Sequence, residues 1–303
     1  MNLRDLDYIC AVADTGHFGR AAEICHVSQP TLSGQIKKLE DYLGVPLFER
    51  ARSGAKLTDV GREIVAVARN IQADAKRIKL LAETRKDPFS GTMSLGIIPT
   101  LAPHIIPIFV PKMSGTFPQL TAQFEEDQTP RLTERLVSGY LDVALLATPP
   151  EHDSLIQVPV FSEPFWLAFP LGHAIGKLDK LTLADLNVDD LMMLSEGHCL
   201  SDQVLELCSA TGRPKHGLKA ASLDTLIKLT AATQAMTLVP ALAVKPENFS
   251  ALGLSVRPID DAAANRIVSL TFRSSLPRKD LVDGVAKLIV SNLPESVTPL
   301  YRI

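Results

Sequence analysis

Residues 28–44 read SQPTLSGQIKKLEDYLG, and this stretch decides the fold of the amino-terminal part of the chain. Ser28 is of the type that caps the start of a helix, and Pro30 suits the first helical turn. Gly44 suits the left-handed residue that follows a helix. The stretch therefore predicts a helix that begins after Ser28 and ends at Leu43.

The flanking segments extend this pattern. Apolar residues recur at helical spacing over residues 3–15 and stop at Gly16, and a short helix is expected over residues 19–25. Residues 47–58 carry basic side chains around Gly54 and predict a two-stranded wing. A helix, a short helix, a tight turn and a longer helix are typical of a helix-turn-helix, and a generic three-helix bundle with a polar outer face is the alternative.

Polar and basic side chains gather on the predicted recognition helix and on the wing. Short hydroxyl and amide side chains near the start of such a helix can reach base edges, whereas Lys and Arg contact phosphates. We therefore expect contacts to double-stranded DNA from Gln29, Pro30, Thr31, Ser33, Gln35, Lys37, Lys38, Arg50 and Arg52. Taken singly, each of these residues is equally compatible with a solvated polar surface.

An uninterrupted helical stretch runs from Thr58 to Lys86 and predicts a rod about 43 Å long at ~1.5 Å per residue. Ile64, Ile71 and Ile78 recur every seven residues along it, as in a two-stranded coiled coil. This apolar seam predicts a homodimer, and packing of the seam on its own chain is the alternative.

Beyond residue 90 the chain alternates apolar runs with helical stretches, which is typical of an α/β domain. About 200 residues in this order suit two small lobes with a crevice between them. We expect a winged helix-turn-helix over residues 1–58, a dimerisation helix and hinge over 59–90, and a two-lobed α/β regulatory domain over 91–303. Strands are expected at 93–98, 120–125, 143–147, 165–169, 192–194, 237–239 and 267–272, and helices at 129–140, from about 202, at 224–233 and at 278–293.

The composition is that of a globular protein. With 46% hydrophobic residues and a formal net charge of −3, the chain is neither disordered nor a protein that coats nucleic acid by bulk attraction. Residues 1–88 hold 14 Lys and Arg against 12 Asp and Glu, so any DNA site must be local. The first twenty residues resemble no secretory signal, and prolines interrupt the apolar stretch 88–111. We expect a cytoplasmic protein without a membrane span.

Three motifs carry a family resemblance: FGRAA at 18–22, SQPTLS at 28–33, and LEDYLGVPLFER at 39–50. They resemble the amino-terminal region of LysR-type transcriptional regulators. The resemblance implies a winged helix-turn-helix, a dimerising linker helix and a two-lobed effector domain similar to periplasmic binding proteins. It also implies a homotetramer and RNA polymerase as a partner.

Cys199 lies at the amino-terminal entrance of a predicted helix whose apolar side includes Cys208. Helix N-termini and adjacent cations lower a cysteine pKa and favour the nucleophilic thiolate. A rigid helix would hold the two Cα atoms ~13 Å apart, whereas a disulfide tolerates about 4.4–6.8 Å. A redox switch in which Cys199 is oxidised by peroxide and Cys208 condenses with it therefore requires this helix to unwind. Two unconnected core cysteines are the alternative.

Residues 197–202, GHCLSD, followed by Cys208, resemble the sensing loop of the peroxide-sensing members of the LysR-type family. The resemblance implies a hydrogen peroxide pocket formed by Thr100, Thr129, His198, Asp202 and Arg266. The residue after Leu200 is often basic in those members and here is Ser201, so one positive charge near Cys199 is missing.

Cys10 and Cys25 lack the spacing of zinc ligands with His17 and His26, and we expect them to be small core residues and the protein to hold neither metal nor cofactor. Together these features predict a peroxide-sensing transcriptional regulator, not an enzyme, that activates antioxidant genes. A LysR-type regulator answering a small metabolite and a thiol peroxidase are the alternatives.

Overall fold

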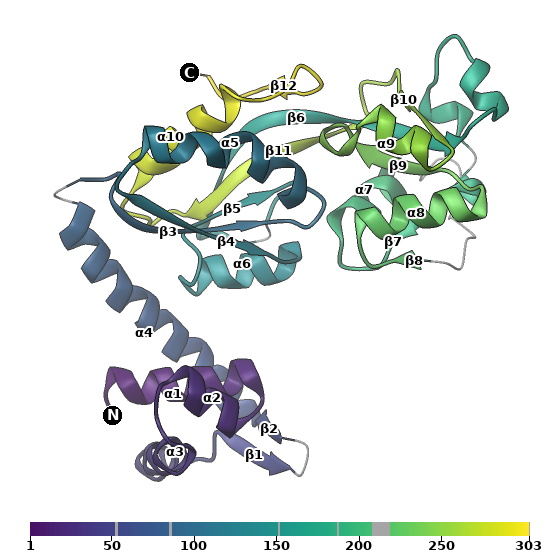
Figure 1. The fold of residues 1–303 in the computed structure, drawn as a ribbon. Helices are drawn as coiled ribbons and strands as arrows, with labels where there is room; N and C mark the ends of the chain where they lie inside the picture. Colours follow the sequence, from purple (N-terminus) through teal and green to yellow (C-terminus); the bar gives the residue numbers. More distant parts are fainter. Residues whose placement is uncertain (52–53, 85–86, 151, 187, 208–218, 303) are drawn as a thin grey trace. The chain divides into compact units, whose positions relative to one another are not determined.

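The computed structural model describes residues 1–51, 54–84, 87–150, 152–186, 188–207 and 219–302. Contacts divide the chain into two compact units, residues 1–82 with 137–140, and residues 83–136 with 141–303. Figure 1 labels the helices and strands of both units.

The first unit is a winged helix-turn-helix followed by a long helix. It consists of α1 (Leu3–Thr15), α2 (Phe18–Ile24), α3 (Gln29–Leu43), β1 (Phe48–Ala51), β2 (Gly54–Leu57) and α4 (Asp59–Thr84). The Ser28 side chain accepts a hydrogen bond from the backbone N–H of Thr31, and Gly44 ends α3 with a φ of 73°. These two caps confirm the helix predicted between Ser28 and Gly44.

The wing is also present and joins the helical core. β1 and β2 pair antiparallel with Phe48 opposite Leu57, and the Phe18 ring packs edge-on against Phe48 at 5.8 Å between centroids. Ile9 and Leu32 are fully buried in the core beneath. The predicted winged helix-turn-helix is confirmed, and a generic three-helix bundle is excluded.

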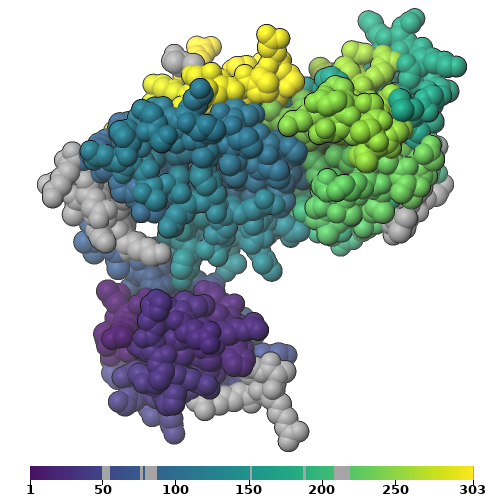
Figure 2. All heavy atoms as spheres, in the orientation of Figure 1, coloured from purple at the N-terminus to yellow at the C-terminus, as the bar shows by residue number. Residues whose placement is uncertain are grey.

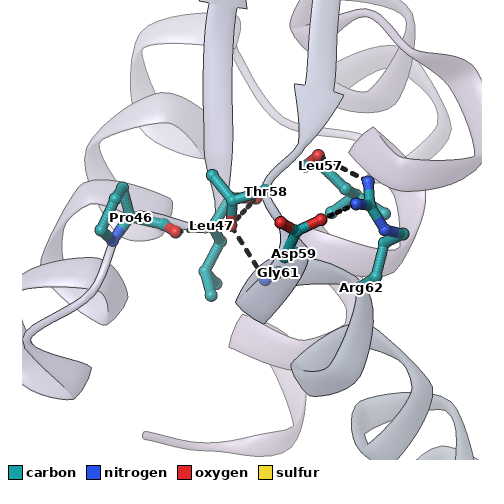
Figure 3. Close-up of polar contacts among 7 residues, drawn as sticks. All are labelled: Pro46, Leu47, Leu57, Thr58, Asp59, Gly61 and Arg62. Atoms are coloured by element: carbon teal, nitrogen blue, oxygen red, sulfur yellow. Dashed lines mark hydrogen bonds and ion pairs between the residues drawn. The ribbon is translucent and has the colours of Figure 1, made fainter.

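Thr58 ties the wing to the start of α4 (Figure 3). Its Oγ1 donates to the carbonyl of Pro46 at 2.8 Å and accepts the backbone N–H of Gly61 at 2.9 Å. Its own N–H donates to the Leu47 carbonyl at 3.0 Å. Thr58 therefore caps α4, and it also fixes the segment that leads into β1.

Arg62, one turn into α4, strengthens the same junction (Figure 3). Its guanidinium donates to the carbonyl of Leu57 at 3.1 Å and pairs with the exposed carboxylate of Asp59. The last residue of the wing and the first turn of α4 are thus held together by both backbone and side-chain bonds.

The second unit is built on a mixed sheet with the strand order β10-β6-β11-β5-β3-β4. Its strands are β3 (Gly91–Ile97), β4 (Leu120–Glu126), β5 (Val143–Leu146), β6 (Leu155–Pro170), β10 (Leu254–Pro258) and β11 (Asn265–Arg273), and β9 (Thr237–Pro240) and β12 (Thr298–Pro299) also pair with β6. β3 runs parallel to β4 and β5, whereas β11 runs antiparallel to β5 and β6.

Two hydrophobic cores divide this unit into two lobes. The first lobe includes α5 (Ala102–Thr116), α6 (Thr129–Val137) and α10 (Lys279–Val290). The second includes β7 (Met193–Leu194), α7 (Cys199–Leu207), β8 (Lys219–Ala220), α8 (Leu223–Thr233) and α9 (Pro246–Ala251), with short 3₁₀ helices at 174–177, 183–185 and 188–190. A further 3₁₀ helix at 241–243 packs Ala241 in the first core. β6 passes between the lobes, because Phe161 lies in the first core and Phe165 in the second. Figure 2 shows the blue-teal and green side chains as two packed bodies. The two-lobed α/β class is confirmed.

The structure differs from the prediction at several elements, and β8, α9 and β12 are among those that the sequence did not predict. β6 begins at Leu155 rather than at residue 165, β10 was not predicted, and α7 begins at Cys199 rather than near residue 202. Pro159 and Pro164 interrupt the apolar run of β6, so only its far half resembles a strand locally. Pairing with β11, which is about a hundred residues away in the chain, holds the remainder.

Prolines are also tolerated in α5, which contains Pro107 and Pro111. The expected interruption of the apolar stretch therefore does not prevent a short helix, which packs in the first core. No helix in the described part of the chain is both long and apolar enough to cross a membrane.

Candidate functional site

Cys199 is the first residue of α7 and lies where the two cores meet. Its side chain is buried and packs with the first core, whereas Leu200 and Val204 of the same helix pack in the second. Gly197 precedes the helix with a φ of 93°, a conformation that favours glycine. The Cys199 thiol is thus held at the boundary between the lobes by a tight turn and a nine-residue helix.

The surroundings of Cys199 act on its pKa in opposite directions. Burial raises the pKa of the thiol, whereas the charge of Arg266, the hydroxyl of Thr129 and the backbone N–H of Leu200 lower it. The carboxylate of Asp202 raises it further. Burial outweighs the cation and the helix start, so the pKa stays above its ordinary value and the neutral thiol is the dominant form at neutral pH.

Arg266 is fixed by a buried ion pair. Its Nε and Nη2 lie 2.9 and 2.8 Å from Glu163 Oε2, and both side chains have no exposed surface. Its Nη1 donates to Thr100 Oγ1 at 2.8 Å. The other oxygen of Glu163 accepts the backbone N–H of Leu242 at 2.8 Å. The guanidinium is therefore held in one orientation, facing Thr100 and close enough to Cys199 to stabilise its thiolate.

The five residues predicted for the peroxide pocket do not share one environment. Thr100, Arg266 and His198 are buried, and Thr129 is the first residue of α6. Thr129 Oγ1 is buried and has no hydrogen-bond partner of regular geometry among the described residues. Its hydroxyl nevertheless lowers the pKa of Cys199, which fits a polar contact between this hydroxyl and the sulfur. The Asp202 side chain is exposed on the outer side of α7. The structure thus places Arg266 and Thr129 beside Cys199, joins Thr100 to Arg266 by a hydrogen bond, and leaves the Asp202 side chain exposed.

Three residues outside the predicted pocket hold this arrangement. Glu163 orients Arg266, as described above. Ser201 Oγ is buried and donates to the carbonyl of Leu194 at 2.9 Å, and Gln203 Nε2 donates to the carbonyl of Ala147 at 2.8 Å. Glu163 and Gln203 bond to residues that are distant in the sequence, and Ser201 is a polar residue whose side chain is buried. No local sequence pattern indicates these bonds. Cys208 lies outside the described residues.

A cavity of about 660 Å³ lies beside α7. It is lined by residues of α7 and β11, including Gln203, Glu206, Asn265 and Arg266. Its position matches the crevice expected between two α/β lobes, and Arg266 borders both this cavity and the surroundings of Cys199.

In the first unit the predicted DNA-contacting residues of α3 lie on its outer side. Gln29, Pro30, Thr31, Lys37 and Lys38 are exposed, and Ser33 and Gln35 are half-buried. The Thr31 hydroxyl also bonds to Ser28 Oγ at 2.7 Å within the helix cap. Arg52 and the side chain of Arg50 lie outside the described residues. This exposed face fits DNA contact and a solvated surface equally.

α4 presents two kinds of apolar position. Val65 and Ala68 are buried in the core of the first unit, whereas Val67, Ile71 and Ile78 are 58%, 38% and 71% exposed. Ile64, the first residue of the predicted seam, also packs against this core. The helix therefore packs on its own chain near its start and leaves the later part of the predicted seam, Ile71 and Ile78, exposed.

The remaining thiols of the first unit belong to its framework. Cys10 is buried in the core, and Cys25 ends α2. His17 caps α2, because its Nδ1 accepts the backbone N–H of Gly19 at 3.0 Å. Cys10, Cys25 and His17 therefore have structural roles, in the core and at the ends of α2.

Two family descriptions match the chain. Residues 3–62 match "Bacterial regulatory helix-turn-helix protein, lysR family", and residues 86–293 match "LysR substrate binding domain". The chain belongs to the LysR family of bacterial regulators. Within this LysR family it is 40% identical over 290 residues to the DNA-binding transcriptional dual regulator OxyR of Escherichia coli, covering 95% of both proteins.

Solved structures of LysR proteins agree. A cysteine-to-aspartate variant of full-length OxyR from Pseudomonas aeruginosa matches with a TM-score of 0.77 and 35% identity, over 97% of this chain and 99% of that one. A hydrogen peroxide-bound cysteine mutant of OxyR from Corynebacterium glutamicum matches with a TM-score of 0.64 and 30% identity, over 96% and 92%. This LysR regulator is therefore similar to peroxide-responsive relatives over both of its units.

Proposed function

We propose that this LysR regulator senses hydrogen peroxide through Cys199 and controls antioxidant genes by a change in its DNA binding. The observation that supports this most is the position of Cys199, buried at the start of α7 beside Arg266 and Thr129. A cation and a hydroxyl around a buried thiol suit a reaction in which negative charge moves from sulfur to a departing oxygen.

The proposed reaction has two steps. The Cys199 thiolate attacks one oxygen of hydrogen peroxide, the O–O bond breaks, and the departing hydroxide takes up a proton to form water. The product is a Cys199 sulfenic acid. The Cys208 thiolate then attacks its sulfur and releases the second water, so two thiols and one peroxide give a disulfide and two waters. Thr100, Thr129, His198 and Arg266 orient the peroxide, and Asp202 joins them when α7 rearranges.

The proposed output is a change in a DNA-bound assembly. The exposed seam of α4 pairs two chains, and the assembly reaches a homotetramer that engages RNA polymerase. α3 enters the major groove with Gln29, Thr31, Ser33 and Gln35, and Lys37, Arg50 and Arg52 contact phosphates. Replacing Arg50 by Ala is expected to weaken binding to all sequences alike, whereas Gln29→Ala relaxes discrimination at one base pair.

The decisive experiment combines mass and footprint. Unalkylated protein treated with one equivalent of peroxide should lose two hydrogens between Cys199 and Cys208, and its footprint on DNA should change. Cys199→Ser should abolish both effects, and Cys208→Ser should stop at a sulfenic acid that dimedone traps. An unchanged footprint after confirmed disulfide formation contradicts the proposal.

A metabolite-responsive regulator is the second candidate, and the cavity of about 660 Å³ beside α7 favours it. Such a protein would bind its ligand reversibly and would keep its response in Cys199→Ser. A thiol peroxidase would instead consume many equivalents of peroxide per chain with a reductant, which a steady-state assay measures directly.

A further inference from the structure

α7 is shared between the two lobes. Cys199 packs in the first core, and Leu200 and Val204 pack in the second. The chain enters the helix from β7, to which Ser201 is tied within the second lobe. Most of the helix packs in the second lobe, so only a few of its side chains contact the first lobe. If the helix unwinds and these contacts break, the interaction between the two lobes changes.

Gln203 makes a directional contact of this kind. Its Nε2 donates at 2.8 Å to the carbonyl of Ala147, which directly follows β5 in the core of the first lobe. Its Oε1 is buried and has no hydrogen-bond partner among the described residues. The carbonyl of Ala147 requires a donor, so the orientation of the amide is fixed. The side chain thus spans the boundary between the lobes with one bond.

We propose that Gln203 is a positioning residue that clasps reduced α7 to the first lobe, so that oxidation of Cys199 is transmitted by loss of this bond. The proposal rests on the proposed peroxide switch. Residue 203 lies between Cys199 and Cys208 in the sequence. Two residues nine positions apart in a rigid helix have Cα atoms ~13 Å apart, beyond disulfide reach. Closing the disulfide unwinds the turn that carries Gln203 and removes its amide from Ala147.

A bond made in only one of two states shifts their equilibrium by its own free energy. A hydrogen bond contributes about 1 kcal/mol, which corresponds to about a five-fold shift. Removing the Gln203 amide should therefore raise the population of the oxidised-type arrangement about five-fold in the reduced protein. It should leave the oxidised protein unchanged, because the bond is already absent there.

The chain supplies a matched control in Gln157. This residue of β6 also carries a half-buried amide, and its Nε2 lies 3.4 Å from the carbonyl of Thr148. Both partners belong to the first lobe, where the neighbours of Gln157 on β6 pack. Gln157→Met therefore repeats the chemical change of Gln203→Met without touching a bond between lobes.

The experiment uses the full chain in the reduced and in the peroxide-oxidised form. Hydrogen exchange is followed over residues 143–149 and 199–207, and DNA footprints are recorded in parallel. Reduced Gln203→Met should exchange about five-fold faster than wild type in both segments and should show more of the oxidised footprint. Oxidised Gln203→Met should match the oxidised wild type, and Gln157→Met should match wild type in both forms.

Two results overturn the clasp. One is equal exchange and footprints in reduced Gln203→Met and Gln157→Met. The other is an equally large change in oxidised Gln203→Met, which marks a general loss of packing. Failure of the proposed function is detected separately, by the mass of the peroxide-treated wild type. If the wild type forms no Cys199–Cys208 disulfide, oxidation cannot act through Gln203, whatever the hydrogen exchange of the reduced variants shows.

Discussion

Glu163 and Arg266 lie directly opposite each other in the antiparallel register of β6 and β11, and their side chains form an ion pair with no exposed surface. The pair is placed where β6 passes from the first core to the second. It therefore fixes the cation beside Cys199 and the strand that links the lobes at the same point.

Removing one member of this pair should be costly. In Arg266→Met the Glu163 carboxylate stays buried without its cation, and breaking a buried pair costs about 3–5 kcal/mol. We expect a loss of that size in the urea unfolding free energy of the second unit, followed through the fluorescence of Trp166, which lies next to both cores. The double variant Glu163→Leu with Arg266→Met should recover most of it. A double variant no more stable than the single one argues against the pair as the cause.

The reactivity of Cys199 should rise steadily with pH. Burial raises the pKa of its thiol, so the thiolate fraction and the rate of alkylation by iodoacetamide should grow about ten-fold per pH unit from 6 to 8.5 without a plateau. Because the folded pKa exceeds the unfolded one, the associated stability is present below the ordinary thiol pKa and is lost as pH rises through the raised value.

Thr129→Val should slow this alkylation at each pH, since the hydroxyl lowers the pKa of Cys199. Cys10 serves as an internal reference, because burial raises its pKa to about 11. It should stay unmodified at neutral pH. A plateau below pH 8 would contradict the raised pKa of Cys199.

Gly61 should tolerate no side chain. A Cβ there would lie 2.2 Å from the carbonyl oxygen of Leu47, so Gly61→Ala must displace the segment that leads into β1 at a cost on the order of 1–3 kcal/mol. Hydrogen exchange over residues 48–57 should accelerate accordingly. Gly34→Ala, in α3 with nothing within 4 Å of the added Cβ, should instead stabilise the unit by about 1 kcal/mol.

A charge on the exposed seam of α4 should prevent dimerisation. Ile71 is 38% exposed in the single chain, and Ile71→Glu would place an unpaired carboxylate in the proposed interface. Sedimentation should show that the Ile71→Glu dimer dissociates at protein concentrations at least about ten-fold higher than the wild-type dimer does. The adjacent exposed Asn70 is the control, and Asn70→Glu should sediment like wild type. Equal sedimentation of both variants would place the interface elsewhere.

Local signals explain what the sequence could predict. Ser28 and Gly44 bound α3 through contacts within one turn, and Thr58 caps α4 in the same way. Cys199 was placed correctly at the start of a helix because Gly197 and the apolar side of α7 are local features.

The remaining features depend on pairing between distant residues. Glu163 pairs with Arg266, which follows it by 103 positions in the sequence. Glu163 itself lies in β6, where Pro159 and Pro164 obscure the alternation of a strand. The pKa of Cys199 follows burial between two cores, which no spacing reveals, so the helix start suggested a lower pKa than the structure supports. Asp202 directly follows the buried Ser201 in α7, and its side chain is exposed only because of the orientation of the helix on the lobes.

The placement of α7 in two cores has a thermodynamic consequence for the DNA. A helix of nine residues is shorter than the ~12–15 residues at which isolated helices become marginal, so α7 exists only while both lobes hold it. Any partner that prefers one arrangement of the lobes must then change the equilibrium constant for reduction of the disulfide by the same factor with which oxidation changes the affinity for that partner, and so shift the reduction potential. A promoter that binds the oxidised form more tightly should therefore itself make the disulfide harder to reduce, and sites of different affinity should return to the reduced state at different glutathione potentials.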